Sequence, residues 1–336
     1  MARVGILGAG SWGTALSLVL HKNGHEVTVW SILEEEVQML RKNREHKEKL
    51  PGVIIPEEIS FTSDLKETVL GRDVLIMAVP SPYIRSTAHL IASMVTDGQI
   101  IVNVAKGIEE KTLDTLTQVI HEEIPNASLA VLSGPSHAEE VGLGIPTTCV
   151  VGSKDKKCAE YIQNLFMNES FRIYTSPDVL GIELGGALKN VVALAAGIAD
   201  GLGYGDNTKA ALITRGIGEI ARLGMAMGGK LETFCGLTGI GDLIVTCASM
   251  HSRNRRAGIL IGKGATMEEA MAEIKMVVEC VYSANAAYAL AQKSHVDVPI
   301  ITELNEVLFH GKDAATTVSD LMLRDKKLEN SSIPWE

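Results

Sequence analysis

The sequence predicts a doubly wound, mostly parallel α/β sheet followed by an all-helical domain. Up to residue 175, short apolar runs typical of buried strands alternate with stretches that can form helices, as in chains of β-α-β units. Near residue 178 the composition changes, and the rest of the chain shows helix-compatible stretches without a convincing strand pattern. The length of 336 residues also exceeds the roughly 250–300 residues at which a single core stops growing. We therefore expect two domains, residues 1–177 and 178–336.

A glycine motif opens the predicted sheet domain. The apolar run at residues 3–7 breaks into Gly8, Gly10 and Gly13, which have the GxGxxG spacing. The first glycine permits a tight turn, the second lets the backbone approach a pyrophosphate, and the third packs helix on strand. Such turns also serve as plain connections, but here a second strand is expected at residues 26–30. This context favours a dinucleotide-binding Rossmann domain.

Strand-length apolar runs continue the predicted sheet. The run at residues 73–80 is continuous, as in strands that are buried on both faces. Further strands are expected at residues 99–104, 128–132, 147–151 and 171–175, with helices at 86–95 and 113–124. The second domain is expected to contain helices at residues 179–199, 208–227, 255–263, 267–274, 283–294 and 301–309.

The residues after the second strand leave the choice between NAD and NADP open. An acidic residue at this strand end would bind the ribose hydroxyls of NAD, whereas an arginine would accept the extra phosphate of NADP. Neither type stands at Ser31 or Ile32. The glutamates at residues 34–36 fit the acidic first turn of a helix, and the basic residues at 41, 42 and 44 fit its solvated face.

Composition limits the class of protein. The formal net charge of −10 argues against nonspecific nucleic-acid binding, so an anionic ligand needs a local cluster of cations and backbone donors. The five cysteines lack zinc-like spacing and are expected to be reduced, small buried residues. Without a signal sequence or a charge-free span of about 18–20 residues, we expect a cytoplasmic protein that contacts no membrane.

Two lysines are candidates for proton transfer. Lys189 lies in otherwise apolar helical sequence, where a lysine ordinarily reaches solvent along its stem. If it is buried instead, its lowered pKa would let it donate or accept a proton near neutral pH, and the neighbouring Asn190 could orient a substrate hydroxyl. Lys106 follows a predicted strand, at the sheet edge where ligands of such folds bind. From these residues alone an exposed Lys189 is favoured, and Lys106 is equally a solvated strand end.

The second domain contains a candidate anion site. Ser252, Arg253 and Asn254 precede a helix expected to begin near Arg255. Together they could hold a phosphate dianion, although a solvated basic turn capped by Ser252 is the alternative. Asp242, which lies beside glycines, could orient Lys189 or accept a substrate hydroxyl.

Seven motifs, in order along nearly the whole chain, resemble those of the bacterial NAD(P)-dependent glycerol-3-phosphate dehydrogenases. They lie at residues 8–13, 106–107, 134–138, 187–190, 207–211, 239–243 and 252–255. The resemblance implies a Rossmann domain followed by a helical domain of the 6-phosphogluconate dehydrogenase-like type. It also implies the reversible, NAD(P)H-dependent reduction of dihydroxyacetone phosphate to sn-glycerol 3-phosphate at C2, which feeds glycerophospholipid synthesis and requires no metal.

Carried over residue by residue, the resemblance places the catalytic lysine at Lys189 and a second active-site lysine at Lys106. Asp242 is expected to act with them. Together with the residues singled out above, the expected substrate contacts are Lys106, Gly134, Ser136, Lys189, Asn190, Asp242, Ser252, Arg253 and Asn254. The expected cofactor contacts, to NAD or NADP, are Gly8, Gly10, Ser11, Trp12, Gly13, Lys106, Ala138, Arg253, Val277 and Glu279. The family pattern also suggests a homodimer that associates through the helical domain.

Three positions depart from the family pattern. The basic residue that many relatives carry after the second strand is missing at Ser31 and Ile32, which weakens the case for strong NADPH preference. Lys49 stands where relatives often have tyrosine, and Cys280 replaces a usual glycine. Two other functions compete with this interpretation: a related dehydrogenase of β-hydroxyacids or sugar-acid phosphates, and a dinucleotide sensor without catalysis.

Overall fold

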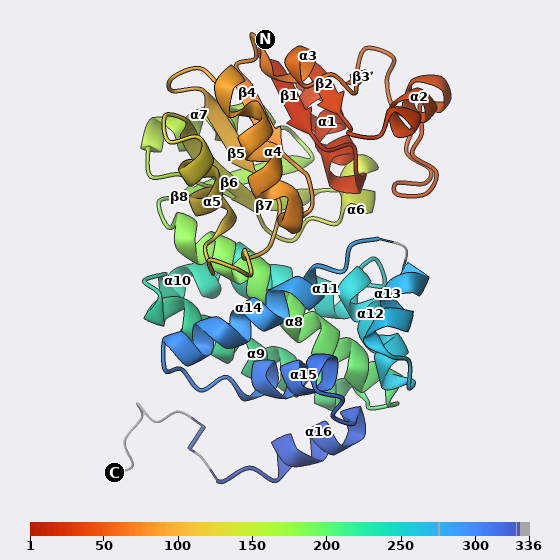
Figure 1. The fold of residues 1–336 in the computed structure, drawn as a ribbon, viewed down its shortest axis with the longest axis vertical. Helices are drawn as coiled ribbons and strands as arrows, with labels where there is room; N and C mark the ends of the chain where they lie inside the picture. Colours follow the sequence, from red (N-terminus) through yellow and green to blue (C-terminus); the bar gives the residue numbers. More distant parts are fainter. Residues whose placement is uncertain (275, 327, 330–336) are drawn as a thin grey trace.

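The computed structural model describes residues 1–274, 276–326 and 328–329 of the chain. A sheet domain and a helical domain lie at opposite ends of the long axis (Figure 1). The last residues of the predicted second domain, 330–336, lie outside the described part.

The sheet domain contains eight strands within the described residues, in the spatial order β3-β2-β1-β4-β5-β6-β7-β8. Their bounds are β1 Arg3–Leu7, β2 Glu26–Trp30, β3 Ser60–Thr62, β4 Val74–Met77, β5 Ile100–Asn103, β6 Ser128–Ser133, β7 Thr147–Gly152 and β8 Phe171–Ser176. Neighbouring strands are parallel except β6 and β7, which pair antiparallel. The chain thus runs outward from β1 in both directions, which confirms the predicted doubly wound sheet.

Helices connect the strands and cover both faces of the sheet. They are α1 Ser11–Lys22, α2 Glu34–Asn43, α3 Leu65–Val69, α4 Ile84–Ile91, α5 Leu116–Glu123, α6 Ala138–Gly142 and α7 Lys156–Phe166, with 3-10 turns at Ser81–Tyr83 (η1) and Ala92–Met94 (η2). The sequence analysis missed β3, because three residues at a sheet edge are too few for an apolar pattern. It also missed α7, although Cys158, Ile162 and Leu165 have helical spacing and are buried.

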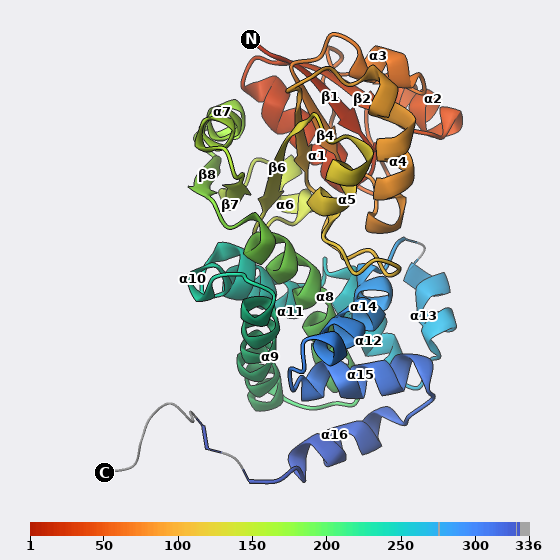
Figure 2. The same cartoon turned by 60° about the vertical axis from the view of Figure 1, so that its left-hand side comes forward.

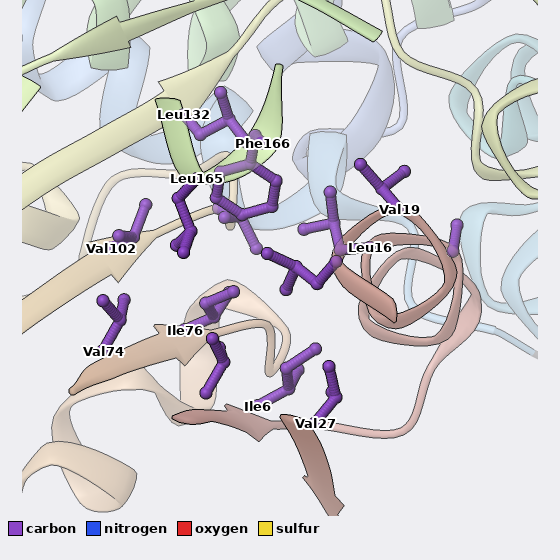
Figure 3. Close-up of a cluster of buried hydrophobic side chains, with 14 of the residues drawn as sticks. Ile6, Leu16, Val19, Val27, Val74, Ile76, Val102, Leu132, Leu165 and Phe166 are labelled. Carbon is purple, nitrogen blue, oxygen red and sulfur yellow. The ribbon is translucent and has the colours of Figure 1, made fainter. Parts of the chain in front are cut away.

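The core between one face of the sheet and helices α1 and α7 is shown in Figure 3. Its labelled residues are Ile6, Val27, Val74, Ile76, Val102 and Leu132 from the strands, Leu16 and Val19 from α1, and Leu165 and Phe166 from α7. Helices α4 and α5 bury the opposite face. Strands between two helical layers are buried on both faces, which explains their continuous apolar runs.

The helical domain is built around α8 (Val179–Gly201), whose residues are nearly all buried. The other helices are α9 Asp206–Ala226, α10 Leu231–Phe234, α11 Asp242–Ala248, α12 Arg253–Gly262, α13 Met267–Ile274, α14 Glu279–Lys293, α15 Pro299–Phe309 and α16 Ala314–Met322, with a π-helical turn, η3, at Leu237–Gly241. The predicted helices are confirmed with shifted ends. α12 begins two residues earlier than expected, because the Ser252 side chain caps it by accepting a hydrogen bond from the Arg255 amide.

Glycines bring α8 and α12 into backbone contact. A Cβ atom added at Gly197 would lie 2.1 Å from the Arg255 carbonyl oxygen, and one at Gly258 would lie 2.2 Å from that of Leu194. By length and composition alone, α8 and the stretch Leu231–Ala248 are apolar enough to cross a membrane. Most of α8 is buried among other elements of the protein, which accounts for its apolar sequence.

Candidate functional site

Residues from both domains meet where the first half of α8 lies beside the sheet domain (Figure 2). Lys106 comes shortly after β5, Asp242 is the first residue of α11, and Lys189 lies on α8. Since ligands of doubly wound sheets bind beyond the carboxyl ends of the strands, this junction is the candidate active site.

The Asp242 carboxylate lies between the two lysine ammonium groups. Lys106 Nζ donates to Asp242 Oδ2 at 2.7 Å and to the Gly134 carbonyl oxygen at 2.9 Å. Lys189 Nζ donates to Asp242 Oδ1 and, at 2.7 Å, to Thr246 Oγ1. The side chain of Lys189 is only 7% exposed. The favoured expectation of an exposed Lys189 was therefore wrong, and Asp242, one of whose expected roles is to orient Lys189, is in contact with it.

Burial and neighbouring charges set the protonation states of Lys189 and Asp242. Burial lowers the pKa of Lys189 to about 8. The charge of Lys106 also lowers this pKa, whereas the charge of Asp242 raises it. Burial also opposes ionisation of Asp242, but the two lysine charges outweigh it and hold the pKa of the carboxyl below its ordinary value. A charged carboxylate thus faces an amine that can gain or lose a proton near neutral pH.

Close backbone packing brings Asp242 to Lys189. A Cβ atom at Gly185 of α8 would lie 2.6 Å from the Thr238 carbonyl oxygen, and one at Gly239 would lie 1.9 Å from that of Phe234. These glycines let the η3 turn pack directly on α8, so that α11 starts beside Lys189. Thr246, one helical turn after Asp242, donates to the Asp242 carbonyl oxygen at 2.6 Å and accepts from Lys189. The sequence analysis missed Thr246, although its i+4 spacing from Asp242 was available.

His137 is a second group that the sequence analysis did not assign to the site. Burial, followed by the charges of Lys189 and Lys106, lowers its pKa to about 4. Its Nε2 atom is buried and has no hydrogen-bond partner within the described part of the chain. Its ring lies 5.7 Å, centroid to centroid, from that of His251. The imidazole beside the lysines is therefore neutral.

A buried carboxylate supports the segment that carries Lys106. The Asn103 side chain accepts from the Ala105 amide at 3.1 Å and donates to the Ala105 carbonyl oxygen at 3.2 Å. Asn103 Nδ2 also donates to Glu183 Oε1 at 3.1 Å, and the Thr117 backbone N–H donates to that oxygen at 2.9 Å. Glu183 of α8 thereby ties the helical domain to the chain just before Lys106.

The predicted anion site forms the N-terminus of α12. Ser252 is the capping residue, and the Arg253 guanidinium donates to the Val277 carbonyl oxygen at 3.0 Å. Asn254 donates to Asn190 Oδ1 at 2.9 Å and accepts from the Cys280 amide at 3.0 Å. A phosphate site and a turn capped by Ser252, the two interpretations of this segment, are thus compatible. A capped helix N-terminus keeps other N–H groups that can bind an anion.

The loop after β6 completes the surroundings of Lys106. Gly134 has φ +145°, and a Cβ atom there would lie 3.0 Å from Cys149 Cα. Its carbonyl oxygen accepts from Lys106 and, at 2.9 Å, from Ser136 Oγ. Ala138 begins α6 directly after this loop. The structure therefore places Gly134 and Ser136 with the lysines, as the sequence predicts, through a backbone conformation that favours glycine.

The glycine loop has the shape of a phosphate cradle. Gly8 has φ +124°, and a Cβ atom there would lie 2.7 Å from the Ala78 backbone. A Cβ atom at Gly13 would lie 2.0 Å from the Gly8 carbonyl oxygen. At Gly10 the same position meets no atom within 4 Å from the described residues beyond its immediate chain neighbours. Two glycines are thus required for packing, and the third leaves open space before the N-terminus of α1, where Ser11 and Trp12 lie. These residues fit a bound dinucleotide pyrophosphate.

The remaining predicted cofactor residues lie between the domains. The Glu279 carboxylate accepts from the Ser81 backbone N–H at 3.3 Å and from the Ser81 hydroxyl. Val277 is bound by Arg253 as described, and Cys280, which replaces the family's glycine, is buried. Glu279 thus joins α14 to the η1 turn that follows β4 in the sheet domain.

Comparison with known proteins gives one consistent family. Two family models match the chain. The model described as NAD-dependent glycerol-3-phosphate dehydrogenase N-terminus matches residues 3–159, and the model described as the C-terminus of the same enzyme matches residues 178–319. The chain is 64% identical to glycerol-3-phosphate dehydrogenase (NAD(P)+) of Agathobacter rectalis over 336 residues, which are 100% of both chains. It is 60% identical to the protein of that name from Fusobacterium nucleatum, covering 99% of this chain and 100% of the relative.

A solved structure extends the similarity to three dimensions. Glycerol-3-phosphate dehydrogenase from Coxiella burnetii superposes with a TM-score of 0.93 at 36% sequence identity. The match covers 96% of this chain and 99% of that one. Both domains and their arrangement are therefore shared.

Proposed function

The chain belongs to the NAD-dependent glycerol-3-phosphate dehydrogenase family, and we propose that Lys189, Lys106 and Asp242 carry out the family's reaction in it. The protein is an oxidoreductase that reduces dihydroxyacetone phosphate to sn-glycerol 3-phosphate with NAD(P)H, reversibly. The observation that carries the assignment is the buried Lys189 bound to Asp242 where the two domains meet.

Lys189 acts as the proton donor. The bound nicotinamide supplies the hydride that is added at C2 of the substrate. Within the described residues Lys189 Nζ has two acceptors, Asp242 and Thr246, so one of its three N–H groups remains for the substrate oxygen. As negative charge develops on that oxygen, the ammonium stabilises it and transfers the proton. In the oxidative direction the neutral amine removes the hydroxyl proton.

Lys106 and Asn190 position the same oxygen. Lys106 Nζ donates to Gly134 and Asp242, so it too retains one N–H for a ligand. Its charge favours the developing alkoxide. Asn190 is joined through its Oδ1 to Asn254, which leaves its Nδ2 to donate to the substrate.

The phosphate of the substrate binds at the N-terminus of α12. Ser252 satisfies the Arg255 amide, so the amides of Arg253 and Asn254 and the helix dipole are directed at an anion. The remaining guanidinium donors of Arg253 add charge. Binding energy gained at the phosphate, remote from C2, holds the carbonyl in position for hydride transfer.

The activity is tested by following the loss of reduced-nicotinamide absorbance with dihydroxyacetone phosphate as the substrate. We expect turnover with the phosphate and none with unphosphorylated dihydroxyacetone, because only the phosphate engages α12. Cofactor binding without turnover would instead support a dinucleotide sensor. Turnover of a β-hydroxyacid in place of the phosphate would support the related dehydrogenases.

Replacing Arg253 with alanine is expected to raise KM for dihydroxyacetone phosphate about thirtyfold, as a lost hydrogen bond to a charged group costs about 2 kcal/mol. The measurement is initial rate against substrate concentration at saturating cofactor. Arg256→Ala, an exposed arginine on the same helix, is the control and should leave KM unchanged. An unchanged KM in Arg253→Ala would remove Arg253 from the phosphate site.

Three further features complete the proposal. The boundary between cofactor and substrate domains lies between Pro177 and Asp178, since β8 ends at Ser176 and the Asp178 side chain caps α8. Two copies of the chain associate through the helical domain. The protein works in the cytoplasm, where its product is the backbone precursor of glycerophospholipids, and it needs neither a membrane nor a nucleic acid.

A further inference from the structure

The end of β2 lies where doubly wound dinucleotide-binding folds hold the adenosine ribose. The Gly8 amide donates to the Trp30 carbonyl oxygen at 2.9 Å, so Ser31 follows directly beside the glycine loop. A pocket of about 720 Å³ opens here, with Ile32, Leu33, Glu36 and Lys49 among its lining residues. In doubly wound dinucleotide-binding folds this position distinguishes a ribose 2′-hydroxyl from a 2′-phosphate.

A partly buried glutamate organises this pocket. Glu36 accepts hydrogen bonds from the Ser31 hydroxyl at 2.5 Å, from His46 Nε2 at 3.0 Å and from the Lys49 ammonium. His46 Nδ1 accepts from the Lys49 amide at 3.3 Å, so Nε2 carries the ring proton and is the donor to Glu36. The Glu36 side chain is only 10% exposed. Its three donors outweigh burial and lower its pKa to about 2, so it is ionised at neutral pH.

The same contacts neutralise Lys49. Its ammonium is paired with a charged carboxylate, and four glutamates but only two lysines line the pocket. Where an arginine would meet a 2′-phosphate, Ile32 is 73% and Leu33 58% exposed. A phosphate dianion entering here would lose hydration near these carboxylates, and the apolar Ile32 and Leu33 offer it no cation. The other lysine of the lining, Lys47, has an exposed side chain. A ribose 2′-hydroxyl can instead donate to the Glu36 carboxylate, which lines the pocket.

We propose that this chain prefers NADH to NADPH, and that Glu36 determines the preference by holding Ser31 and neutralising Lys49. The inference rests on the proposed function, because it assumes that a dinucleotide binds at the glycine loop. It also assigns a role to Lys49, which departs from the family pattern. The charge of Lys49 is neutralised by Glu36 within the protein.

The test measures dissociation constants for NADH and NADPH by reduced-nicotinamide fluorescence, without substrate, on the full chain. For the unmodified protein we expect NADH to bind at least about tenfold more tightly, given the repulsion between like charges. Ile32→Arg places a cation at an exposed position and should tighten NADPH binding about tenfold with little change for NADH. Equal or tighter binding of NADPH by the unmodified protein would overturn the proposal.

Glu36→Gln isolates the role of the glutamate. It removes the carboxylate and frees the Lys49 ammonium, so NADPH should bind more tightly and NADH more weakly. Glu35→Gln, which makes the same charge change at an exposed neighbour, is the matched control and should have a smaller effect. Equal effects of the two variants would contradict the assignment of Glu36. If Glu36→Gln does not fold, the two dissociation constants of the unmodified protein still decide the preference.

Binding of the two cofactors also separates this inference from the proposed function. If neither dinucleotide binds, the proposed function fails together with the preference. If both bind and dihydroxyacetone phosphate is reduced, but NADPH binds as tightly as NADH, only the preference fails.

Discussion

Replacing Lys189 with methionine is expected to lower kcat for dihydroxyacetone phosphate reduction by about a thousandfold or more, since proton transfer and charge stabilisation at C2 are both lost. Methionine keeps the length and the apolar stem. Dissociation constants for the dinucleotide should change little, because Lys189 lies on α8 and not in the glycine loop. The two measurements are steady-state turnover and fluorescence titration of NADH.

A matched control is Lys312→Met. Lys312 is also paired with carboxylates, Glu303 at 2.6 Å and Asp320 at 2.7 Å, but it lies outside the site. Turnover in this variant should remain normal. Near-normal turnover in Lys189→Met would remove the proposed mechanism.

The same lysine sets the pH dependence. Reduction needs the ammonium form, so kcat/KM for dihydroxyacetone phosphate should fall as pH rises through about 8, the lowered pKa of Lys189. Oxidation of sn-glycerol 3-phosphate needs the neutral amine and should increase over the same range. Both of these pH-dependent limbs, the fall in reduction and the rise in oxidation, should be absent from the residual activity of Lys189→Met. A limb that persists there would belong to another group.

Replacing Asp242 with asparagine should have the second-largest effect. Two ammonium groups would then face each other without a carboxylate between them. We expect the free energy of unfolding to fall by about 3 kcal/mol, as is typical when one partner of a buried ion pair is removed. The pKa of Lys189 should fall further, so that reduction is lost at a lower pH than in the unmodified protein. Urea unfolding and the pH profile measure these effects.

Asp200→Asn separates the two consequences. Asp200 pairs with Lys209 at 2.8 Å and with Arg255 at 2.7 Å, so its loss should also destabilise the protein. It should not move the pH limb, because neither partner is Lys189. A limb that stays in place in Asp242→Asn would show that Asp242 does not control the protonation of Lys189.

Local sequence was sufficient for the fold class and for the dinucleotide turn. Apolar runs that are buried on both faces identify parallel strands, and the spacing of Gly8, Gly10 and Gly13 reports a backbone requirement confined to a few residues. The sequence analysis missed the short strand β3 because its pairing with β2, and not its own composition, makes it a strand. Family resemblance added the site residues, of which the structure places Gly134 and Asp242 in contact with the two lysines.

Only the tertiary structure decided what those residues can do. The sequence of α8 does not show whether Lys189 reaches solvent. Nearly the whole helix is buried, so its sequence has no polar face that would mark a solvent-exposed side. The carboxylate that holds it is 53 residues away in the chain, and Lys106 is 136 residues from the same carboxylate. In the same way, Glu36 neutralises Lys49 through a loop that folds back on α2. Protonation and charge depend on burial and on such distant partners, so they follow from packing, whereas strand and turn patterns follow from neighbouring residues.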